Sequence, residues 1–174
     1  PQQEILVNQL TALVSWQQDK SQTWHASVDN LQGQLNNQIV AVGQLSLNQK
    51  KDVLSVAIKD ADIKQGAKLA AALTVTPQQI KTWLLQAKPS GQVSKLVAQL
   101  NLQQQKIITL SAQIKDFTAL ATSNMIGVNK MNLWLNHQNS KGYAGINIKQ
   151  GQLDLKPIYR QATPVDQLSA LLKW

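Results

Sequence analysis

Residues 39–60 read "IVAVGQLSLNQKKDVLSVAIKD", and this stretch decides the fold class. It holds two runs in which apolar and polar residues alternate, separated by the short polar segment "NQKKD" at 48–52. Successive side chains of a β-strand point to opposite faces, so each run predicts a strand with one apolar and one polar face. A short polar link between two such runs predicts an antiparallel hairpin. The apolar side of this hairpin would hold Ile39, Ala41, Leu45, Leu47, Leu54, Val56 and Ile58.

The same alternation returns further along the chain, again with Gln, Asn, Ser, Thr or Lys on the opposite face in most runs. Short polar segments at 101–106 and 137–142 link some of these runs. No strand–helix–strand alternation is present, so a parallel α/β sheet is not expected. The predicted fold class is therefore mainly β, an antiparallel meander with one wet face. The further apolar rows are Leu96, Ala98, Leu100, Leu102; Ile108, Leu110, Ala112, Ile114; Met131, Leu133, Leu135; Ile146, Ile148; and Leu153, Leu155.

One long stretch, residues 61–91, breaks the period of two and predicts a helical insertion between two groups of strands. An alanine-rich segment at 67–72 follows Asp62 and predicts a short helix. A second helix is expected over about 77–87, with Thr76 as N-cap and Pro77 at the first helical position. Its apolar side would hold Ile80, Trp83, Leu84 and Ala87, and Pro89 and Gly91 would end it.

Two other stretches are expected to be irregular. Residues 117–129, "FTALATSNMIGVN", predict a long connection, and 156–165, "KPIYRQATPV", predict a proline-bearing loop.

Composition excludes several classes of protein. The chain has 174 residues, of which 43% are hydrophobic and only 15% charged, where about 25% charged is usual. Gln and Asn replace the missing charges, but they alternate with apolar residues, which argues against a prion-like tract. No cysteine is present, so disulfides and cysteine zinc sites are excluded. The net charge of +8 comes from scattered lysines with Arg160 as the one arginine, and without clustered aromatics this pattern does not predict nucleic-acid binding.

No segment has the about 18 apolar residues that cross a bilayer, and no basic-then-apolar signal segment opens the chain. Solvated lysines on polar strand faces explain most of the charge, and diffuse attraction to anionic membranes is the second interpretation.

No catalytic or metal-binding constellation is evident, so the chain is not expected to be an enzyme and no cofactor is expected. His25 and His137 lie far apart, each near a hairpin, and are interpreted as surface or strand-edge histidines. Asp60 and Asp62 could share a strand face as paired carboxylates, but they precede a predicted helix and are interpreted as capping or turn residues. The glycines form no phosphate-binding loop and the serines no nucleophile elbow.

The chain ends on a copy of its own beginning. Residues 165–174, "VDQLSALLKW", share six of ten positions with 7–16, "VNQLTALVSW", including the tryptophan. This repeat indicates a piece of a longer array in which 164–174 is the first strand of the next unit. A weaker copy at 128–153 matches 7–35 in part, and whether it is a true repeat stays open.

An apolar sheet face must be covered, and several arrangements would cover it. The sheet could close into a barrel, pack on a second sheet, curl around a helix, or stay partly open as a groove for an apolar ligand. The five tryptophans fit either a core or a groove.

Several segments of the sequence resemble the YhdP branch of the AsmA-like envelope proteins, a family of bridge-like lipid transfer proteins. The segment 77–103 is similar to a family element that turns from a helix into a strand. The segment 7–35 resembles a family hairpin, although Ala12 and Ala170 stand where the family has glycine. The segment 151–174 resembles its junction between units. The matching residues are Trp83, Leu84, Pro89, Gly91, Val93, Leu96; Trp16, Trp24, Val28, Asn30, Leu31; and Pro157, Ile158, Tyr159, Arg160, Pro164, Asp166, Leu168.

The resemblance implies a fold and a function. Residues 1–174 would be one segment of a repetitive, U-shaped β-groove (a β-taco) in the periplasm of Gram-negative bacteria, within a protein anchored in the inner membrane. Phospholipids would move through the apolar groove to the outer membrane, so the expected partners are phospholipid acyl chains and neighbouring units of the same chain. No nucleic acid, metal or catalytic residue is implied. The residues expected to line the groove are Ile39, Leu45, Leu47, Leu54, Val56, Ile58, Leu96, Leu100, Leu102, Ile108, Leu110, Ile114, Leu133 and Ile146.

Three other functions are weighed against this one. A repetitive structural or adhesin-like envelope protein would have the same strands around a closed, ligand-free core. A piece of an outer-membrane barrel should carry aromatic girdles, and aromatic residues are only 5% of the chain. An enzyme comes last, for lack of a site.

Overall fold

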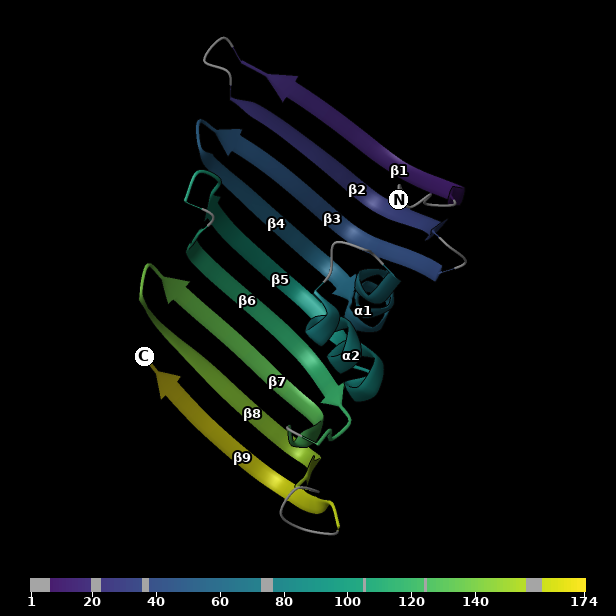
Figure 1. The fold of residues 1–174 in the computed structure, drawn as a ribbon, viewed down its shortest axis with the longest axis vertical. Helices are drawn as coiled ribbons and strands as arrows, with labels where there is room; N and C mark the ends of the chain where they lie inside the picture. The colour runs from purple at the N-terminus through teal and green to yellow at the C-terminus, as the bar shows by residue number, and fades with distance from the viewer. Residues whose placement is uncertain are drawn as a thin grey trace.

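The chain folds into one open antiparallel sheet of nine strands, with two short helices beside the ends of its central strands (Figure 1). The computed structural model describes residues 7–19, 23–35, 38–72, 77–104, 106–123, 125–155 and 161–174. Strand order follows chain order from β1 to β9, so the predicted meander is confirmed. The elements are β1 (Val7–Gln18), β2 (Trp24–Leu35), β3 (Gln38–Lys50), β4 (Val53–Asp62), α1 (Ile63–Ala72), α2 (Gln78–Ala87), β5 (Ser90–Asn101), β6 (Lys106–Ala119), β7 (Gly127–Gln138), β8 (Lys141–Asp154) and β9 (Thr163–Lys173).

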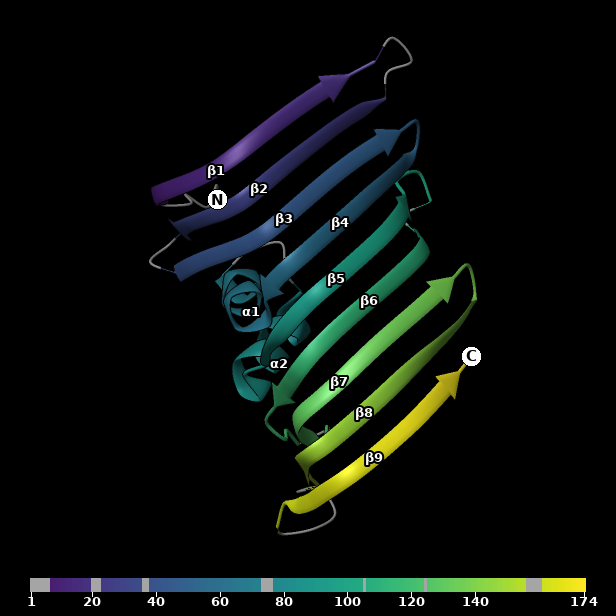
Figure 2. The same ribbon diagram turned by 180° about the vertical axis from the view of Figure 1, so that it is seen from behind.

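The sheet is a single layer. Figures 1 and 2 show its two sides, and of the described elements only α1 and α2 lie outside it. The accessible surface is 12120 Å², whereas a compact protein of 19.2 kDa would expose about 8,400 Å². Among the described residues, the buried apolar side chains are one isoleucine, four alanines and one proline: Ile148, Ala87, Ala112, Ala119, Ala144 and Pro89. Because no second layer covers the sheet, its apolar side chains stay partly exposed.

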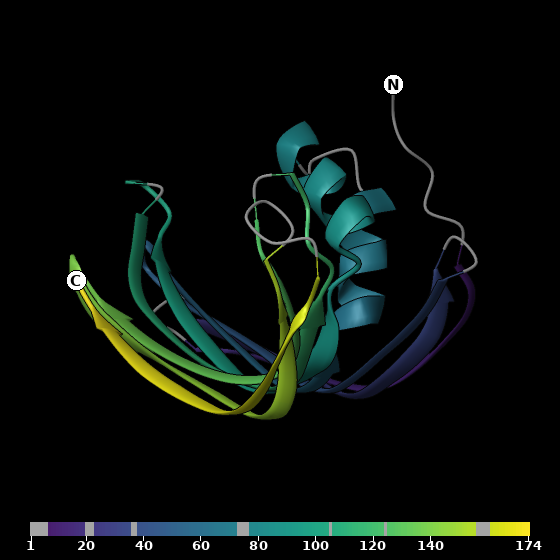
Figure 3. The same cartoon turned by 90° about the horizontal axis from the view of Figure 1, so that it is seen from below.

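The strands are sharply bent, so the sheet forms a trough whose two rims rise on the same side (Figure 3). The bend coincides with strand residues whose backbone is left-handed, a conformation that costs about 1–2 kcal/mol for most residues. Register places these residues near one level in β2 and in each strand from β4 to β8, although the level drifts along the sheet. We call this row the fold line, and it consists of Asn30 in β2, Asp60 in β4, Asp116 in β6, Lys130 in β7 and Gln150 in β8, with Gly91 (φ +135°) in β5.

Contacts at the fold line show which face is on the inside. Residues three apart in a flat strand are about 10 Å apart and point to opposite faces. In β8, however, a Cβ added at Gly151 would collide with Cγ2 of Ile148, on the other side of Gln150. The strand therefore folds toward the side that carries Ile148, which is the apolar side described below.

The two helices lie at one rim of the trough, between the end of β4 and the start of β5 (Figure 3). α1 begins directly after β4, where the carboxylate of Asp62 accepts a hydrogen bond from the Gln65 N–H (2.9 Å). The predicted capping role of Asp62 is thus confirmed, and the helix starts four residues before the predicted 67–72. Gln65 Oε1 accepts a bond from the Ala41 N–H (2.7 Å), a donor of β3 that β4 no longer reaches. The side chain thereby satisfies a backbone group at the exposed end of β3.

α2 confirms the second predicted helix, with Pro77 at the N-cap and not at the first helical position. The predicted cap Thr76 lies outside the described residues. Lys88 takes a left-handed C-cap conformation, and the Ala87 carbonyl accepts a bond from the Leu120 N–H (2.7 Å), which ties the helix end to the end of β6. None of the described helices has the length and apolar character to cross a membrane.

The predicted connection at 117–129 is too long. β6 continues to Ala119 and β7 starts at Gly127, so the connection is 120–126. The bend at Asp116 interrupts the alternation there, and this interruption conceals the last residues of the strand. Similarly, Thr163, Pro164 and Val165 of the predicted loop 156–165 belong to β9, while 156–160 lie outside the described residues.

Gly91 tests the fold line directly. Its φ of +135° suits only glycine, and an added Cβ would lie 2.9 Å from the Lys115 carbonyl oxygen and 3.0 Å from the Phe117 Cα. Gly91→Ala is therefore expected to lower the free energy of unfolding by about 1–3 kcal/mol, measured by urea denaturation. The matched control is Gly66→Ala in α1. An added Cβ there would have no atom of another part of the protein within 4 Å, so this change should stabilise the protein by about 0.5–1 kcal/mol. Equal effects at the two glycines would contradict the assignment.

Gln150 offers a second test that depends only on backbone conformation. It is exposed and has φ 51°, so Gln150→Val should be about 1–2 kcal/mol less stable than Gln150→Gly. At the neighbouring exposed Lys149, which has ordinary strand geometry, the order should reverse because valine favours strands and glycine does not. The same order at both positions in urea unfolding would show that residue 150 is not left-handed.

Candidate functional site

The candidate site is the apolar side of the sheet, which register assembles into rows that cross all nine strands. Directly paired residues of an antiparallel sheet share a face. One row contains no polar residue, and eight steps of about 4.8 Å make it about 38 Å long. This row consists of Val14, Val28, Leu45, Ile58, Leu96, Ala112, Leu135, Ala144 and Leu172.

A second row runs beside the first, two residues nearer the hairpins, and has a tryptophan at each end. It consists of Trp16, Ala26, Leu47, Val56, Ala98, Leu110, His137, Gly142 and Trp174. Together with the rows on either side, these residues define what we call the apolar face. Among the described residues of this face that pair with a neighbouring strand, there is no lysine, aspartate or glutamate.

Aromatic contacts order both edges of the apolar face. Trp16 stacks on Trp24 with ring centroids 5.2 Å apart, and the Trp24 indole N–H donates to Gln49 Oε1 (3.1 Å). At the other edge Trp174 stacks on His137 (6.1 Å), and its indole N–H donates to His137 Nδ1 (3.3 Å). His137, interpreted from the sequence as a surface or strand-edge histidine, therefore lies on the apolar face beside the edge strand β9 and packs with an aromatic ring.

Exposure differs between the middle and the edges of the apolar face. Most of its large side chains in the central strands are half-buried although no second layer covers them, and Ile107 in β6, at 43% exposed, is an exception. Strongly exposed members lie on the edge strands, such as Trp16 (63%) and Leu172 (53%). The curvature of the sheet explains the difference, because side chains on the inside of a bend converge and cover one another.

Eleven of the fourteen predicted groove residues share the apolar face. These are Leu45, Leu47, Leu54, Val56, Ile58, Leu96, Leu100, Leu110, Ile114, Leu133 and Ile146.

The other three predicted residues lie elsewhere. Ile39 is 67% exposed near the start of β3, beyond the fold line. Leu102 lies in the turn after β5, where its N–H donates to the Asp52 carbonyl (2.8 Å). A register shift in the β5–β6 pair places Ile107 opposite Leu100, and Ile108 lines a hollow of the polar side beside Gln99. Alternation counted along one strand cannot detect this bulge, and the prediction therefore named Ile108 although Ile107 is the residue on the apolar face.

The prediction also missed members of the apolar face. The largest fully buried side chain is Ile148, 1% exposed, which lies directly at the fold line. The alternation around Met131 and Ile148 was visible in the sequence, but the bend that buries Ile148 was not. The predicted groove set also contains no residue of β1, β2 or β9, although these strands contribute Val14, Trp16, Trp24, Ala26, Val28, Leu168, Ala170 and Leu172 to the apolar face.

The opposite side is polar, with side chains hydrogen-bonded between neighbouring strands. Examples are Gln44 to Asp29 (3.0 Å) and Asn147 to Ser169 (2.8 Å). One aromatic pair interrupts this polar side, since Trp134 lies over Gly145 and meets Tyr143 edge to face (5.4 Å). An aromatic ring over a glycine shields backbone that would otherwise be bare, which gives this pair a structural role.

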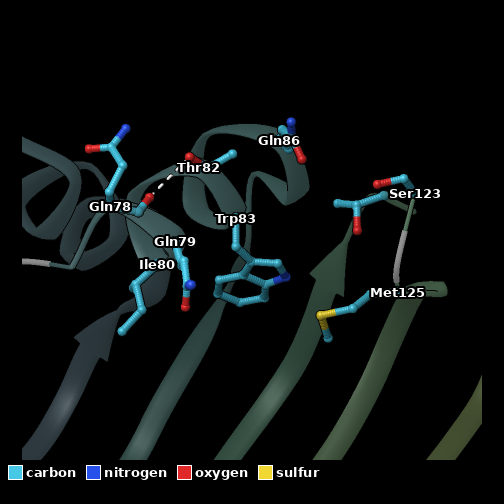
Figure 4. Close-up of a pocket in the computed structure, with 9 residues that line it drawn as sticks. Gln78, Gln79, Ile80, Thr82, Trp83, Gln86, Ser123 and Met125 are labelled. Carbon is cyan, nitrogen blue, oxygen red and sulfur yellow. Dashed lines mark hydrogen bonds between the residues drawn. The ribbon is translucent and has the colours of Figure 1, made fainter.

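Two hollows lie at the helices. One, of about 510 Å³, is lined by α2 and the 120–126 connection, and Figure 4 shows Trp83 reaching from the helix toward Met125. Ile80 also lines it, and its other lining residues carry amides or hydroxyls, with the Thr82 hydroxyl donating to the Gln78 carbonyl (3.0 Å). The other, of about 260 Å³, lies between α1 and α2. Among the described residues, no cluster of three or more His, Cys, Asp or Glu is placed to hold a metal ion.

Ile148 tests the burial created by the bend. Ile148→Ala is expected to lower the free energy of unfolding by about 2–4 kcal/mol, because it empties a buried site. Leu171→Ala, on the polar side and 56% exposed, should change it by about 0.5 kcal/mol or less. Similar losses in urea unfolding would mean that the bend does not bury Ile148.

Comparison with known proteins agrees with this architecture. No curated protein and no solved structure matches the chain. A family model described as YhdP protein matches residues 1–174, the whole chain. The earlier resemblance is thereby confirmed, and the match is consistent with an envelope protein of lipid-transport type. This chain belongs to the YhdP family.

Proposed function

We propose that this chain is a periplasmic segment of an inner-membrane-anchored bridge that carries phospholipids between the inner and outer membranes. The acyl chains would lie along the apolar face, inside the trough. The observation that carries the proposal is the uninterrupted apolar row across nine strands, on the concave side and without charge. Membership of the YhdP family supports the same function.

The dimensions of the apolar face suit an acyl chain. The row is about 38 Å long, whereas one leaflet of a bilayer has a hydrocarbon thickness of about 15 Å. Each methylene moved from water onto an apolar surface contributes about 0.8 kcal/mol, so a chain of ordinary length has ample driving force to stay in the trough. Since every strand contributes similar residues, no position along the row binds much more tightly than the next. Such an even surface favours movement along the trough.

The competing function is a structural, adhesin-like protein that transports nothing. In that case the apolar face would be a dry core closed by contacts within the protein. The half-exposed central side chains and the large accessible surface favour an open trough.

Site-specific photo-crosslinking in the full-length protein tests the proposal. A photoreactive amino acid at Leu100, on the apolar face, should form adducts with phospholipid that mass spectrometry detects. The adjacent Gln99, on the polar side, should form few. Adducts at Gln99 as abundant as those at Leu100 would sink the proposal.

A charge on the apolar face should stop occupancy while leaving the fold intact. Val56→Lys places an ammonium group among apolar side chains, so the Leu100 adduct should fall at least tenfold. Ser55→Lys, one residue away on the polar side, is the matched control and should leave the adduct unchanged. Circular dichroism would verify that both variants keep the sheet.

A further inference from the structure

The positive charge of the chain is concentrated in one stretch of the sequence, on side chains that lie outside the apolar face. Residues 63–115 contain seven lysines and no aspartate or glutamate, although the whole chain carries nine acidic residues. This region includes both helices. Since the apolar face excludes charge, these lysines lie on the polar side or on the helices, where an anion in solution could reach them.

Three of the lysines surround one hollow. The hollow between α1 and α2, about 260 Å³, has an apolar floor that includes Ala67, Leu84 and Pro89. Lys64, Lys68 and Lys88 line it as well, and all three are exposed. None of the described residues that line it is acidic. The nearest acidic residue in the sequence, Asp62, already accepts the Gln65 N–H.

The local structure fixes this arrangement and leaves its charge unbalanced. Lys64 and Lys68 are four residues apart on α1, so they share a helix face and repel each other. Lys88 is held in a left-handed C-cap by its N–H bond to the Leu84 carbonyl (3.1 Å), followed by the buried Pro89. A bound anion would relieve the repulsion while the apolar floor covered adjoining methylenes.

The position of the helices matches the path of a lipid headgroup. α1 and α2 stand at one rim, on the side toward which the sheet curls (Figure 3). A phospholipid with its acyl chains on the uncharged apolar face must keep its polar headgroup outside the trough, at a rim. A headgroup moving along this rim would therefore pass the helices.

We infer that the hollow between α1 and α2 binds the headgroup of anionic phospholipids and discriminates against zwitterionic ones. This inference rests on the proposed function and names the lipid class that it favours. The three ammonium groups interact with the phosphate, and the apolar floor contacts the glycerol and the first methylenes. Zwitterionic headgroups bind less well because their own cation is repelled by the lysines.

The test compares soluble short-chain phosphatidylglycerol with phosphatidylcholine of the same chain length, binding to the full 174-residue chain. NMR shifts of the α1 and α2 amides report occupancy of the hollow. Phosphatidylglycerol should bind at least tenfold more tightly. The triple variant Lys64→Gln, Lys68→Gln, Lys88→Gln should weaken it by roughly one hundredfold, from about fivefold for each lysine.

A second triple variant provides the matched control. Lys59→Gln, Lys95→Gln, Lys141→Gln removes the same charge from the polar side of the sheet and should leave binding at the hollow within about twofold. Equal affinity for the two lipids, or equal losses in the two triple variants, would overturn the inference. Inorganic phosphate is the third probe, and if it displaced the lipid at equal concentration the hollow would be a phosphate site and not a lipid site.

The outcomes also separate this inference from the conduit itself. Selective binding at the helices without adducts at Leu100 would support the headgroup site and contradict the proposed conduit function. Adducts at Leu100 that are equally abundant for both lipids and unchanged by the helix variant would support the conduit and overturn the headgroup site.

Discussion

The constraint on which the structure depends is the bend at the fold line. Five non-glycine strand residues hold a left-handed backbone there, which together cost about 5–10 kcal/mol. At about 25 cal/mol per Å², burying some 200–400 Å² more apolar surface offsets that cost. A few tens of apolar side chains line the face, so each needs to lose only about 10–15 Å² of exposure. A modest convergence of side chains on the inside of the bend is therefore enough to stabilise a single-layer sheet.

The same bend creates the site. A flat sheet would hold the same rows in register, but both of its faces would be open to water. Bending turns the uncharged face inward and leaves it half covered, which is the condition that a ligand of acyl chains requires. The residues that pay the backbone strain are mostly Asn, Asp, Lys and Gln, and none of them belongs to the apolar rows. Fold and site are thus specified by different residues that occupy the same strands.

Much of this architecture could be predicted from local pattern, because alternation is a property of neighbouring residues in one strand. The runs around Leu45 and Val56 identify strands and faces without knowledge of any partner, and the cap at Asp62 and the helix before Pro89 are equally local. Alternation could not reveal features that depend on how one strand pairs with another or where a strand bends. The bulge that exchanges Ile107 for Ile108 depends on how β6 pairs with β5, and the burial of Ile148 depends on a bend set by a left-handed residue two positions away.

The two edges and the distribution of charge suit a sheet built by repetition. β1 and β9 have similar sequences, and because eight antiparallel steps separate them they run in the same direction. Trp16 and Trp174 consequently occupy the two ends of one row, each stacked on a ring to one side. A strand copied at this interval prolongs the apolar rows without a break, whereas any lysine on that face would interrupt them. Confining the lysines to the polar side and the helices therefore keeps the inner surface uniform however many strands are added.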